Sequence, residues 1–295
     1  MEGIPATAAR FRAVSGSLYV VATPLGNLRD MTLRALDVLG SASVIAAEDT
    51  RMTQRLLAHY GIGTRTVSLH AHNEAQRSAS LVARLAAGES VALVTDAGTP
   101  AISDPGARLV RAVREAGHPV VPVPGPSAVA TAISAAGLSA AMFVFAGFLP
   151  TQAKERRTRL AALAALPAAL VFYEAPHRVR ATVAELAATL DPARTLVVGR
   201  ELTKTFESIV SMPLRDGEAW IAVDPNHERG EFVLMVDEPL AAEGAAVLDA
   251  EGEKWLHALL AELPPARAAR VVAAVTGTSR DELYRRALAR KGEAT

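Results

Sequence analysis

The chain has 295 residues, of which 50% are hydrophobic and 21% charged, so it can bury a large core and is not disordered as a whole. A chain of this length predicts two domains at about 150 residues each. Basic and acidic residues number 31 each, so no global positive field draws the chain to nucleic acid or anionic lipid, and a polyanion would have to bind local basic patches.

The absence of cysteine excludes disulfide bonds, Cys-ligated zinc, iron–sulfur clusters and thiol nucleophiles, and favours a reducing cytoplasm. Residues 1–16 lack the apolar segment of a secretory signal, and we expect them to form a loose tail. Residues 119–153 contain no charged side chain and are long enough to span a membrane. Prolines interrupt their first part, so we expect no membrane helix and no membrane partner.

Four strand–loop–helix units follow one another in the first half of the chain. Each begins with an apolar run, continues through a loop rich in Gly, Pro or Asp, and ends in helical periodicity. The predicted strands cover residues 18–22, 42–46, 91–94 and 119–123, and the predicted helices cover 31–39, 53–59, 105–116 and a segment after Ser127. This alternation is typical of a parallel α/β sheet, whose ligands bind beyond the carboxyl ends of the strands.

A second α/β set follows from about Met142. Its predicted strands cover residues 142–146, 169–173, 195–199, 218–223 and 231–236. Turns at Gly217 and at 226–230 indicate antiparallel hairpins late in this set, so the sequence predicts a mixed sheet.

The last part of the chain is predicted to be a linker and a small helical extension. Residues 240–253 are rich in Ala, Gly, Glu and Asp, which is typical of a linker. Pro264 and Pro265 open one helix, and Ser279 with Glu282 forms a capping box for another, an arrangement similar to a helix-turn-helix. The predicted division is a tail (1–16), two α/β domains (17–125 and 126–240), and the linker with its extension (241–295).

Charge is unevenly distributed along the neutral chain. Residues 201–253 hold 13 acidic and 3 basic residues, whereas residues 264–295 hold 7 basic and 3 acidic ones. Residues 151–160 add 4 basic residues against 1 acidic residue. The two basic segments are therefore the candidate contacts with RNA or DNA.

The loops after the predicted strands carry the candidate chemistry. No dinucleotide fingerprint follows a strand, and Walker, H-E-x-x-H and G-x-S-x-G motifs are absent, which removes most support for an NTPase or hydrolase. Asp96, beside the permissive Gly98, can bind a ribose or an amino group, or it can simply close an Asx turn. Ser127 can cap the following helix, whose free N–H groups suit an anion.

Two further clusters remain open to more than one interpretation. His70 and His72 lie two residues apart but have no visible third ligand, so no metal site is expected. The segment from Glu174 to Arg178 places a carboxylate, an imidazole and a guanidinium at a strand end, as a functional site or as a structural ion pair.

Eight segments, taken in chain order between Leu18 and Val236, resemble the tetrapyrrole methylase family. They read LYVVATPLGNLRDMTLRAL, AAEDTR, HAHNE, VALVTDAGTPAISDPG, VPVPGPSA, FAGFLP, FYEAPHR and GRELTKTFE. Tetrapyrrole-type members have Gly-Asp-Pro where this chain has Thr95-Asp96-Ala97, and AEDTR and YEAPHR are similar to the branch that methylates ribosomal RNA. The helical extension resembles that of the same branch.

The resemblance implies S-adenosylmethionine as methyl donor, a cleft between two α/β domains, and a homodimer. It implies methylation of the 2′-hydroxyl of a cytidine in 16S rRNA at the decoding centre, on naked RNA or on the 30S subunit. The donor-binding residues that it implies are Pro24, Leu25, Asp96, Ala97, Thr99, Ser127, Ala128, Phe172 and Tyr173.

Methyl transfer from a sulfonium needs alignment of the reacting atoms and no metal, but the attacking hydroxyl must lose its proton to a nearby base. The unranked candidates for that base are Asp49, Glu174, Glu201 and Lys204. The candidates for RNA contact, which can also be ordinary solvated charges, are Arg51, Lys154, Arg156, Arg157, His177, Arg178 and Arg200. The rival functions are a corrin or porphyrin C-methyltransferase and a non-catalytic RNA-binding module.

Overall fold

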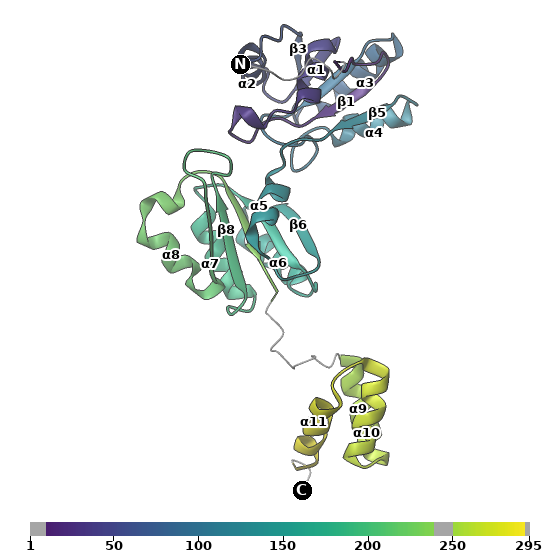
Figure 1. Ribbon diagram of the computed structural model, residues 1–295, viewed down its shortest axis with the longest axis vertical. Helices are drawn as coiled ribbons and strands as arrows, with labels where there is room; N and C mark the ends of the chain where they lie inside the picture. The colour runs from purple at the N-terminus through teal and green to yellow at the C-terminus, as the bar shows by residue number, and fades with distance from the viewer. Residues whose placement is uncertain (1–9, 239–249, 293–295) are drawn as a thin grey trace. The chain divides into compact units, whose positions relative to one another are not determined.

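The computed structural model describes residues 10–238 and 250–292. The chain divides into two compact units, residues 1–238 and 239–295. The first unit contains two five-stranded sheets, which follow each other along the chain, and the second contains three helices (Figure 1).

The first sheet is entirely parallel, as the sequence predicts. Its strands lie in the order β3-β2-β4-β1-β5. The strands are β1 (Leu18–Val21), β2 (Val44–Ala47), β3 (Thr66–Ser68), β4 (Val91–Val94) and β5 (Val120–Val123). Strand β3 was not predicted, because its three residues are too few to form an apolar run.

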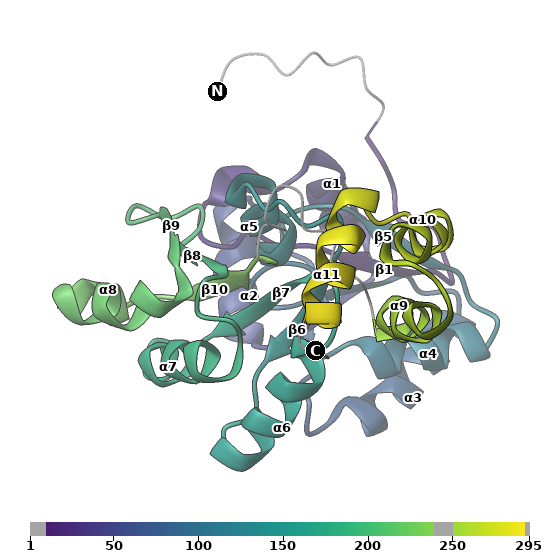
Figure 2. The ribbon, with the colours of Figure 1, turned by 90° about the horizontal axis from the view of Figure 1, so that it is seen from below.

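Helices cover both faces of the first sheet because successive strand residues point to opposite sides. The helices on this sheet are α1 (Leu33–Ser41), α2 (Thr50–His59), α3 (Glu74–Ala86) and α4 (Ala107–Glu115). Tyr19 and Val21 pack with α1 and α2, whereas Leu18 packs with α3 and α4 on the other face. Helices α3 and α4 lie side by side there (Figure 2).

The second sheet is mixed, with strand order β6-β7-β10-β8-β9. Strand β10 is antiparallel to both of its neighbours, and β6 is parallel to β7. The strands are β6 (Phe143–Phe148), β7 (Ala169–Glu174), β8 (Thr195–Arg200), β9 (Ser208–Pro213) and β10 (Phe232–Val236). Helix α5 (Ala128–Ala136) covers one face, and α6 (Ala153–Ala164), α7 (Val179–Thr189) and α8 (Gly217–Val223) cover the other.

The prediction of a strand at 218–223 is wrong, because this segment forms helix α8. Ile221 is buried against α7 and the sheet, whereas Val223 is exposed. In a strand these two residues would face the same side, so the difference in burial fits a surface helix. The missing strand is β9, which pairs with β8 as an antiparallel hairpin. Its alternating residues are only partly buried at the edge of the sheet, so no continuous apolar run marked it.

The second unit is a small bundle of α9 (Ala250–Glu262), α10 (Pro265–Thr276) and α11 (Arg280–Gly292). Its core contains Leu256, Val272 and Leu283. Residues 250–253 begin α9, so they are not part of a linker, and residues 240–249 of the predicted linker lie outside the described residues. None of the described helices is both long enough and apolar enough to cross a membrane.

Part of the predicted loose tail is held against the first sheet. The Phe11 N–H donates to Asp37 at 3.0 Å, and the Ala13 N–H donates to Ser41 Oγ at 2.9 Å. The Phe11 ring also packs edge-on against Tyr19, 6.0 Å between ring centroids. Residues 10–14 are therefore tied to α1 and β1, and residues 1–9 lie outside the described residues.

Candidate active site

Three loops meet at the carboxyl ends of β1, β4 and β5. Backbone hydrogen bonds of 2.9 and 3.0 Å join Thr23 to Gly98, and the Thr99 hydroxyl donates to the Pro126 carbonyl at 2.9 Å. Gly98 has φ +83°, and a Cβ added there would lie 3.2 Å from Leu25 Cδ2. Glycine is therefore required where these loops come closest.

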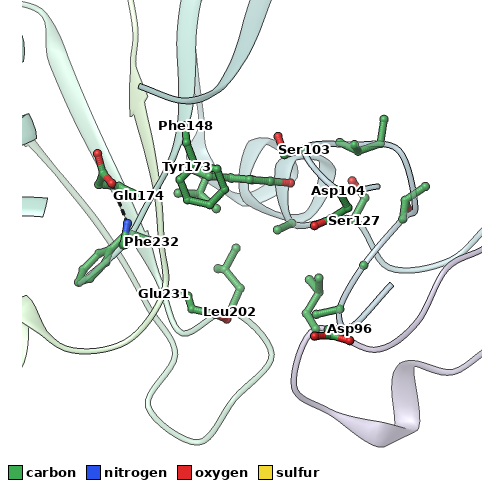
Figure 3. Close-up of a pocket in the computed structure, with 18 of the residues that line it drawn as sticks. Asp96, Ser103, Asp104, Ser127, Phe148, Tyr173, Glu174, Leu202, Glu231 and Phe232 are labelled. Carbon is green, nitrogen blue, oxygen red and sulfur yellow. Dashed lines mark hydrogen bonds between the residues drawn. The ribbon is translucent and has the colours of Figure 1, made fainter. Parts of the chain in front are cut away.

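A cavity of about 410 Å³ lies between these loops and the second sheet, within the usual size range of ligand pockets (Figure 3). Its walls combine apolar side chains with hydroxyl and carboxylate groups. The lining residues include Leu25, Glu48, Asp96, Ala97, Thr99, Ile102, Ser103, Asp104, Ser127, Ala128, Phe148, Tyr173, Glu174, Pro176, Leu202, Glu231 and Val233.

Tyr173 forms the wall on the side of the second sheet. Its hydroxyl accepts a hydrogen bond from the Val129 N–H at 3.0 Å, at the start of α5. Its ring packs edge-on against Phe145 and Phe148, at centroid distances of 4.7 and 5.7 Å. Burial raises the pKa of Tyr173, so its hydroxyl stays protonated.

Three carboxylates gather on the opposite wall, from the loops after β2 and β4. Burial, together with the neighbouring Glu48 and Asp96, raises the pKa of Asp104 to about 6. Burial also raises the pKa of Glu48. One oxygen of Asp96 accepts the Asp49 N–H at 3.0 Å, which fixes the direction of that carboxylate. This wall therefore suits a ligand with a positive charge.

Two strained turns place apolar side chains in the cavity. Ala101 and Ser103 have φ +66°, and Glu201 and Thr203 have φ +51° and +68°. The residue between each pair, Ile102 or Leu202, lines the cavity. Such conformations cost about 1–3 kcal/mol each and persist where surrounding structure holds them.

Buried Glu74 supplies part of that support. Its Oε1 accepts the N–H groups of Gly106, Arg108 and Leu109 at 3.0, 2.9 and 3.4 Å. These donors begin α4, where a negative charge is favourable. Glu74 therefore fixes the end of the loop that carries Asp104.

The structure does not favour Glu174 as a base. Its side chain is fully buried, and its carboxylate accepts the Thr182 hydroxyl at 2.6 Å and the Ala175 N–H at 2.8 Å. Arg178 lies 3.3 Å from the same carboxylate. Figure 3 shows this group on the side of β7 away from Asp96 and Asp104. Glu174 is a structural anchor of the strand end.

The other three candidates for the base are also engaged. Lys204 Nζ lies 2.8 Å from both Glu201 and Glu231. Burial acts to lower the pKa of Lys204, but hydrogen bonds and attraction to these carboxylates raise it overall, so the lysine stays charged. Arg51 hydrogen-bonds Asp49 at 2.8 Å and lowers the pKa of that carboxyl to about 2. Neither Asp49, Glu201 nor Lys204 lines the described cavity.

The expected donor-binding residues divide between the cavity and the core. Leu25, Asp96, Ala97, Thr99, Ser127, Ala128 and Tyr173 line the cavity. Pro24 is buried and does not line it. Phe172 is fully buried with α6 and α7 on the opposite face of the second sheet, because neighbouring strand residues alternate in direction. The Phe172 side chain therefore does not line the cavity.

The basic segment on α6 is partly structural. Arg156 is buried, pairs with Glu185 at 3.0 Å and donates to the carbonyls of Pro150 and Thr151, which rules it out as a surface contact for RNA. Arg157 pairs with the same Glu185 at 2.6 Å but remains 71% exposed. Lys154 and Arg159 are also exposed, so the segment keeps three surface cations.

The remaining basic candidates lie in different surroundings. Arg178 donates to the Leu149 carbonyl at 2.6 Å, and Arg200 donates to Ser208 Oγ and the Arg229 carbonyl, each at 3.3 Å. Arg51 is exposed beside Asp49, and His177 is exposed next to the cavity residue Pro176. Arg178 and Arg200 therefore stabilise the second sheet and its loops.

Sequence reasoning missed Glu48, Ser103, Asp104, Phe148 and Leu202 as cavity residues. All lie in segments that were singled out, but as neighbours of the chosen residues. Asp104 precedes Pro105-Gly106, which is typical of a turn and hid its position in the wall. Within the described residues, no group of three or more His, Asp and Glu side chains is placed to hold a metal ion.

Comparison with known families settles the class of the chain. Residues 17–217 match the model of the Tetrapyrrole (Corrin/Porphyrin) Methylases, and residues 246–291 match the RsmI C-terminal HTH domain. The chain belongs to the tetrapyrrole methylase family. Most residues that line the cavity lie within the part of the chain that matches the methylase model.

Two curated relatives are each named Ribosomal RNA small subunit methyltransferase I. The one from Pseudomonas aeruginosa is 48% identical over 279 residues, covering 95% of this chain and 99% of the relative. The one from Escherichia coli O157:H7 is 48% identical over 277 residues, covering 94% and 96%. This identity places the chain in the ribosomal RNA branch of the family.

Solved methylase structures share the fold of the first unit. A uroporphyrin-III-C-methyltransferase from Thermus thermophilus aligns with TM-score 0.55 and 24% identity over 78% of this chain and 97% of that one. A cobalt precorrin-4 methyltransferase of cobalamin biosynthesis aligns with TM-score 0.55 and 19% identity over 75% and 95%. The predicted α/β fold of the tetrapyrrole methylase type, with a small helical extension, is thus confirmed.

Proposed function

We propose that this protein transfers a methyl group from S-adenosylmethionine to the 2′-hydroxyl of a cytidine ribose in 16S rRNA, at the decoding centre of the small ribosomal subunit. The observation that carries the proposal is 48% identity along 95% of the chain to a curated Ribosomal RNA small subunit methyltransferase I. That similarity covers both the α/β unit and the helical extension, so it favours the rRNA branch over a tetrapyrrole substrate.

The cavity has the chemistry that S-adenosylmethionine requires. Leu25, Leu202 and Val233 provide apolar surface for an adenine ring, and the Asp96 carboxylate can accept hydrogen bonds from ribose hydroxyls. Gly98 lets backbone approach the ligand without a clashing Cβ. When bound, S-adenosylmethionine supplies a methyl group on a positively charged sulfur, which suits the acidic wall.

The protein's own residues hold and shield this site. Tyr173 is fixed by its hydrogen bond to Val129, and Leu202 is held between two strained residues, so both present preformed surfaces. Preformed apolar walls exclude water and hold the reacting groups in line, which is where the main acceleration of a direct displacement arises.

Exposed cations near the cavity and on the helical unit are the proposed RNA contacts. Lys154 and Arg157 lie on α6, which follows the cavity residue Phe148 after a short loop. Arg267 and Arg270 lie exposed on α10. We further propose that the protein acts as a homodimer on the assembled 30S subunit in the cytoplasm, where a cysteine-free chain needs no oxidising compartment.

The test uses 30S subunits from bacteria that lack this gene, tritiated S-adenosylmethionine and full-length protein. We expect label in 16S rRNA, recovered after nuclease digestion as 2′-O-methylcytidine by mass spectrometry. Label on a base or in uroporphyrinogen instead would contradict the proposal. Calorimetry that detects no donor binding would favour the non-catalytic RNA-binding module.

A matched pair of variants connects the activity to the cavity. Asp96→Asn removes the charge from a cavity wall, and we expect it to weaken donor binding about tenfold or more, as for a lost charge-assisted hydrogen bond. Asp216→Asn changes an exposed Asp beside α8 that makes no side-chain cap hydrogen bond, and we expect no change.

A further inference from the structure

We infer that Asp104 is the general base that takes the proton from the attacking ribose hydroxyl. The inference rests on the proposed function and assigns the step for which Asp49, Glu174, Glu201 and Lys204 had been the candidates. Those four are engaged in hydrogen bonds or ion pairs, as described above. The base must therefore be sought among the other carboxylates of the cavity.

The cavity wall holds five carboxylates, and three of them are already committed. Glu174 is saturated by hydrogen bonds on the far side of β7. Glu231 pairs with Lys204 at 2.8 Å. Asp96 is oriented by the Asp49 N–H and is the group that best suits the donor ribose. Asp104 and Glu48 remain.

Asp104 is the better placed of the two. No hydrogen-bond donor or cation within residues 10–238 and 250–292 contacts its carboxylate. Asp104 is close enough to Tyr173 to raise the pKa of that phenol, so it faces the aromatic wall of the second sheet. Figure 3 shows Asp104 and the Tyr173 hydroxyl on facing sides of the cavity.

That aromatic wall is also where a nucleotide can enter. Phe148 lines the cavity yet is 53% exposed, so its ring edge reaches solvent beside Tyr173. Unpaired nucleotides are held by stacking on such rings. A ribose brought in past Phe148 and Tyr173 meets Asp104, which faces Tyr173 across the cavity (Figure 3).

The surroundings of Asp104 suit proton transfer. Its titratable neighbours include Glu48 and Asp96, whose charges disfavour a further negative charge, and Tyr173, whose hydroxyl stays protonated. The loop that carries it is fixed by the strained Ser103 and by Glu74, which accepts the Gly106 N–H. A carboxylate that is poorly solvated and rigidly held is a stronger base than an exposed one.

The step balances without a further reagent. The 2′-oxygen forms a bond to the methyl carbon while the carbon–sulfur bond breaks and its electron pair returns to sulfur. The hydroxyl proton passes to the Asp104 carboxylate. One positive and one negative charge disappear together, so a poorly solvated cavity favours the products.

The experiment compares Asp104→Asn with Glu48→Gln, and with Asp216→Asn as an exposed control. Single-turnover methylation of 30S subunits is measured against pH at saturating donor. Donor affinity is measured by calorimetry. Protonation of the Asp104 carboxyl group is followed by infrared spectroscopy of the donor-free protein during a pH titration, as the difference between wild type and Asp104→Asn. This readout does not depend on activity.

We expect Asp104→Asn to lower the single-turnover rate at saturating donor about 10²–10⁴-fold, a far larger effect than its effect on donor affinity. The wild-type rate should rise with pH and level off above about 6, and the infrared titration should place a carboxyl pKa near the same value. Asp104→Asn should lose both the pH dependence of the rate and the infrared signal. Glu48→Gln should keep both, shifted to lower pH, because Glu48 raises the pKa of Asp104.

Several results would overturn the inference. An Asp104→Asn enzyme that retains the wild-type rate, or whose loss follows from weaker donor binding alone, contradicts the role of base. Loss of the pH dependence in Glu48→Gln assigns the role to Glu48 instead. A folded wild-type protein that binds donor but methylates no RNA contradicts the proposed function itself, which separates that failure from this one.

Discussion

Replacement of Glu74 by alanine tests how the candidate active site is held in place. The Glu74 carboxylate is buried and accepts three backbone N–H groups, from Gly106, Arg108 and Leu109, at 2.9–3.4 Å. Hydrogen bonds to a charged group contribute about 1.5–3 kcal/mol each, but their contributions are not additive and one of these three bonds is long. We therefore expect Glu74→Ala to lower the free energy of unfolding by about 3 kcal/mol in total.

The loss should be measurable in two ways. For a unit of this size, about 3 kcal/mol lowers the thermal midpoint by about 6–12 °C. Amide exchange at Gly106, Arg108 and Leu109 should accelerate about 100-fold, as read by mass spectrometry of the peptide that contains them. Exposed Glu115 at the end of α4 is the matched control, and Glu115→Ala should change neither quantity. A Glu74→Ala protein with wild-type exchange in this peptide would refute the reasoning.

Three further predictions concern stability. Arg156→Ala should lower the free energy of unfolding by about 3 kcal/mol because it breaks a buried ion pair, whereas Arg157→Ala, at an exposed position, should lower it by less than about 1 kcal/mol. Thermal unfolding distinguishes the two variants, and equal losses would contradict a structural role for Arg156. Gly98→Ala, at φ +83°, should cost about 1–2 kcal/mol and weaken donor binding in calorimetry. The pKa of Asp104 is about 6 in the folded protein against 3.8 for a free Asp, so ionisation of Asp104 destabilises the fold. Above pH 6, Asp104→Asn should therefore be more stable than wild type by about 1.5 kcal/mol, after allowance for partial solvation. The difference should vanish below pH 4, as measured by thermal melting at a series of pH values.

The sequence predicted the first sheet well because its strands are buried on both faces. Runs such as Val91–Val94 are apolar at every position, and that signal is independent of the rest of the chain. Strand β9 gave no such signal, since it lies at a sheet edge and its side chains are only partly buried. Strand β9 depends on pairing with β8, which local sequence does not reveal.

The sequence located the loops of the site, and most of the expected donor-binding residues line the cavity, but Pro24 and Phe172 do not. The segments around Asp96 and Tyr173 do meet at one cavity, as their positions after strands indicate. Phe172 was misplaced because the family motif identifies a segment without saying which of two neighbouring residues faces the ligand. Arg156 was misplaced because its partner Glu185 lies on another helix, a contact that only the tertiary structure supplies.

The chain passes from the first sheet to the second once, through residues 124–127. Pro126 is tied to Thr99 on the first sheet, while Val129 is tied to Tyr173 on the second. The backbone between these two ties is Ser127 and Ala128, which lie in the cavity wall. A rotation of one sheet against the other would therefore pivot at residues that line the cavity.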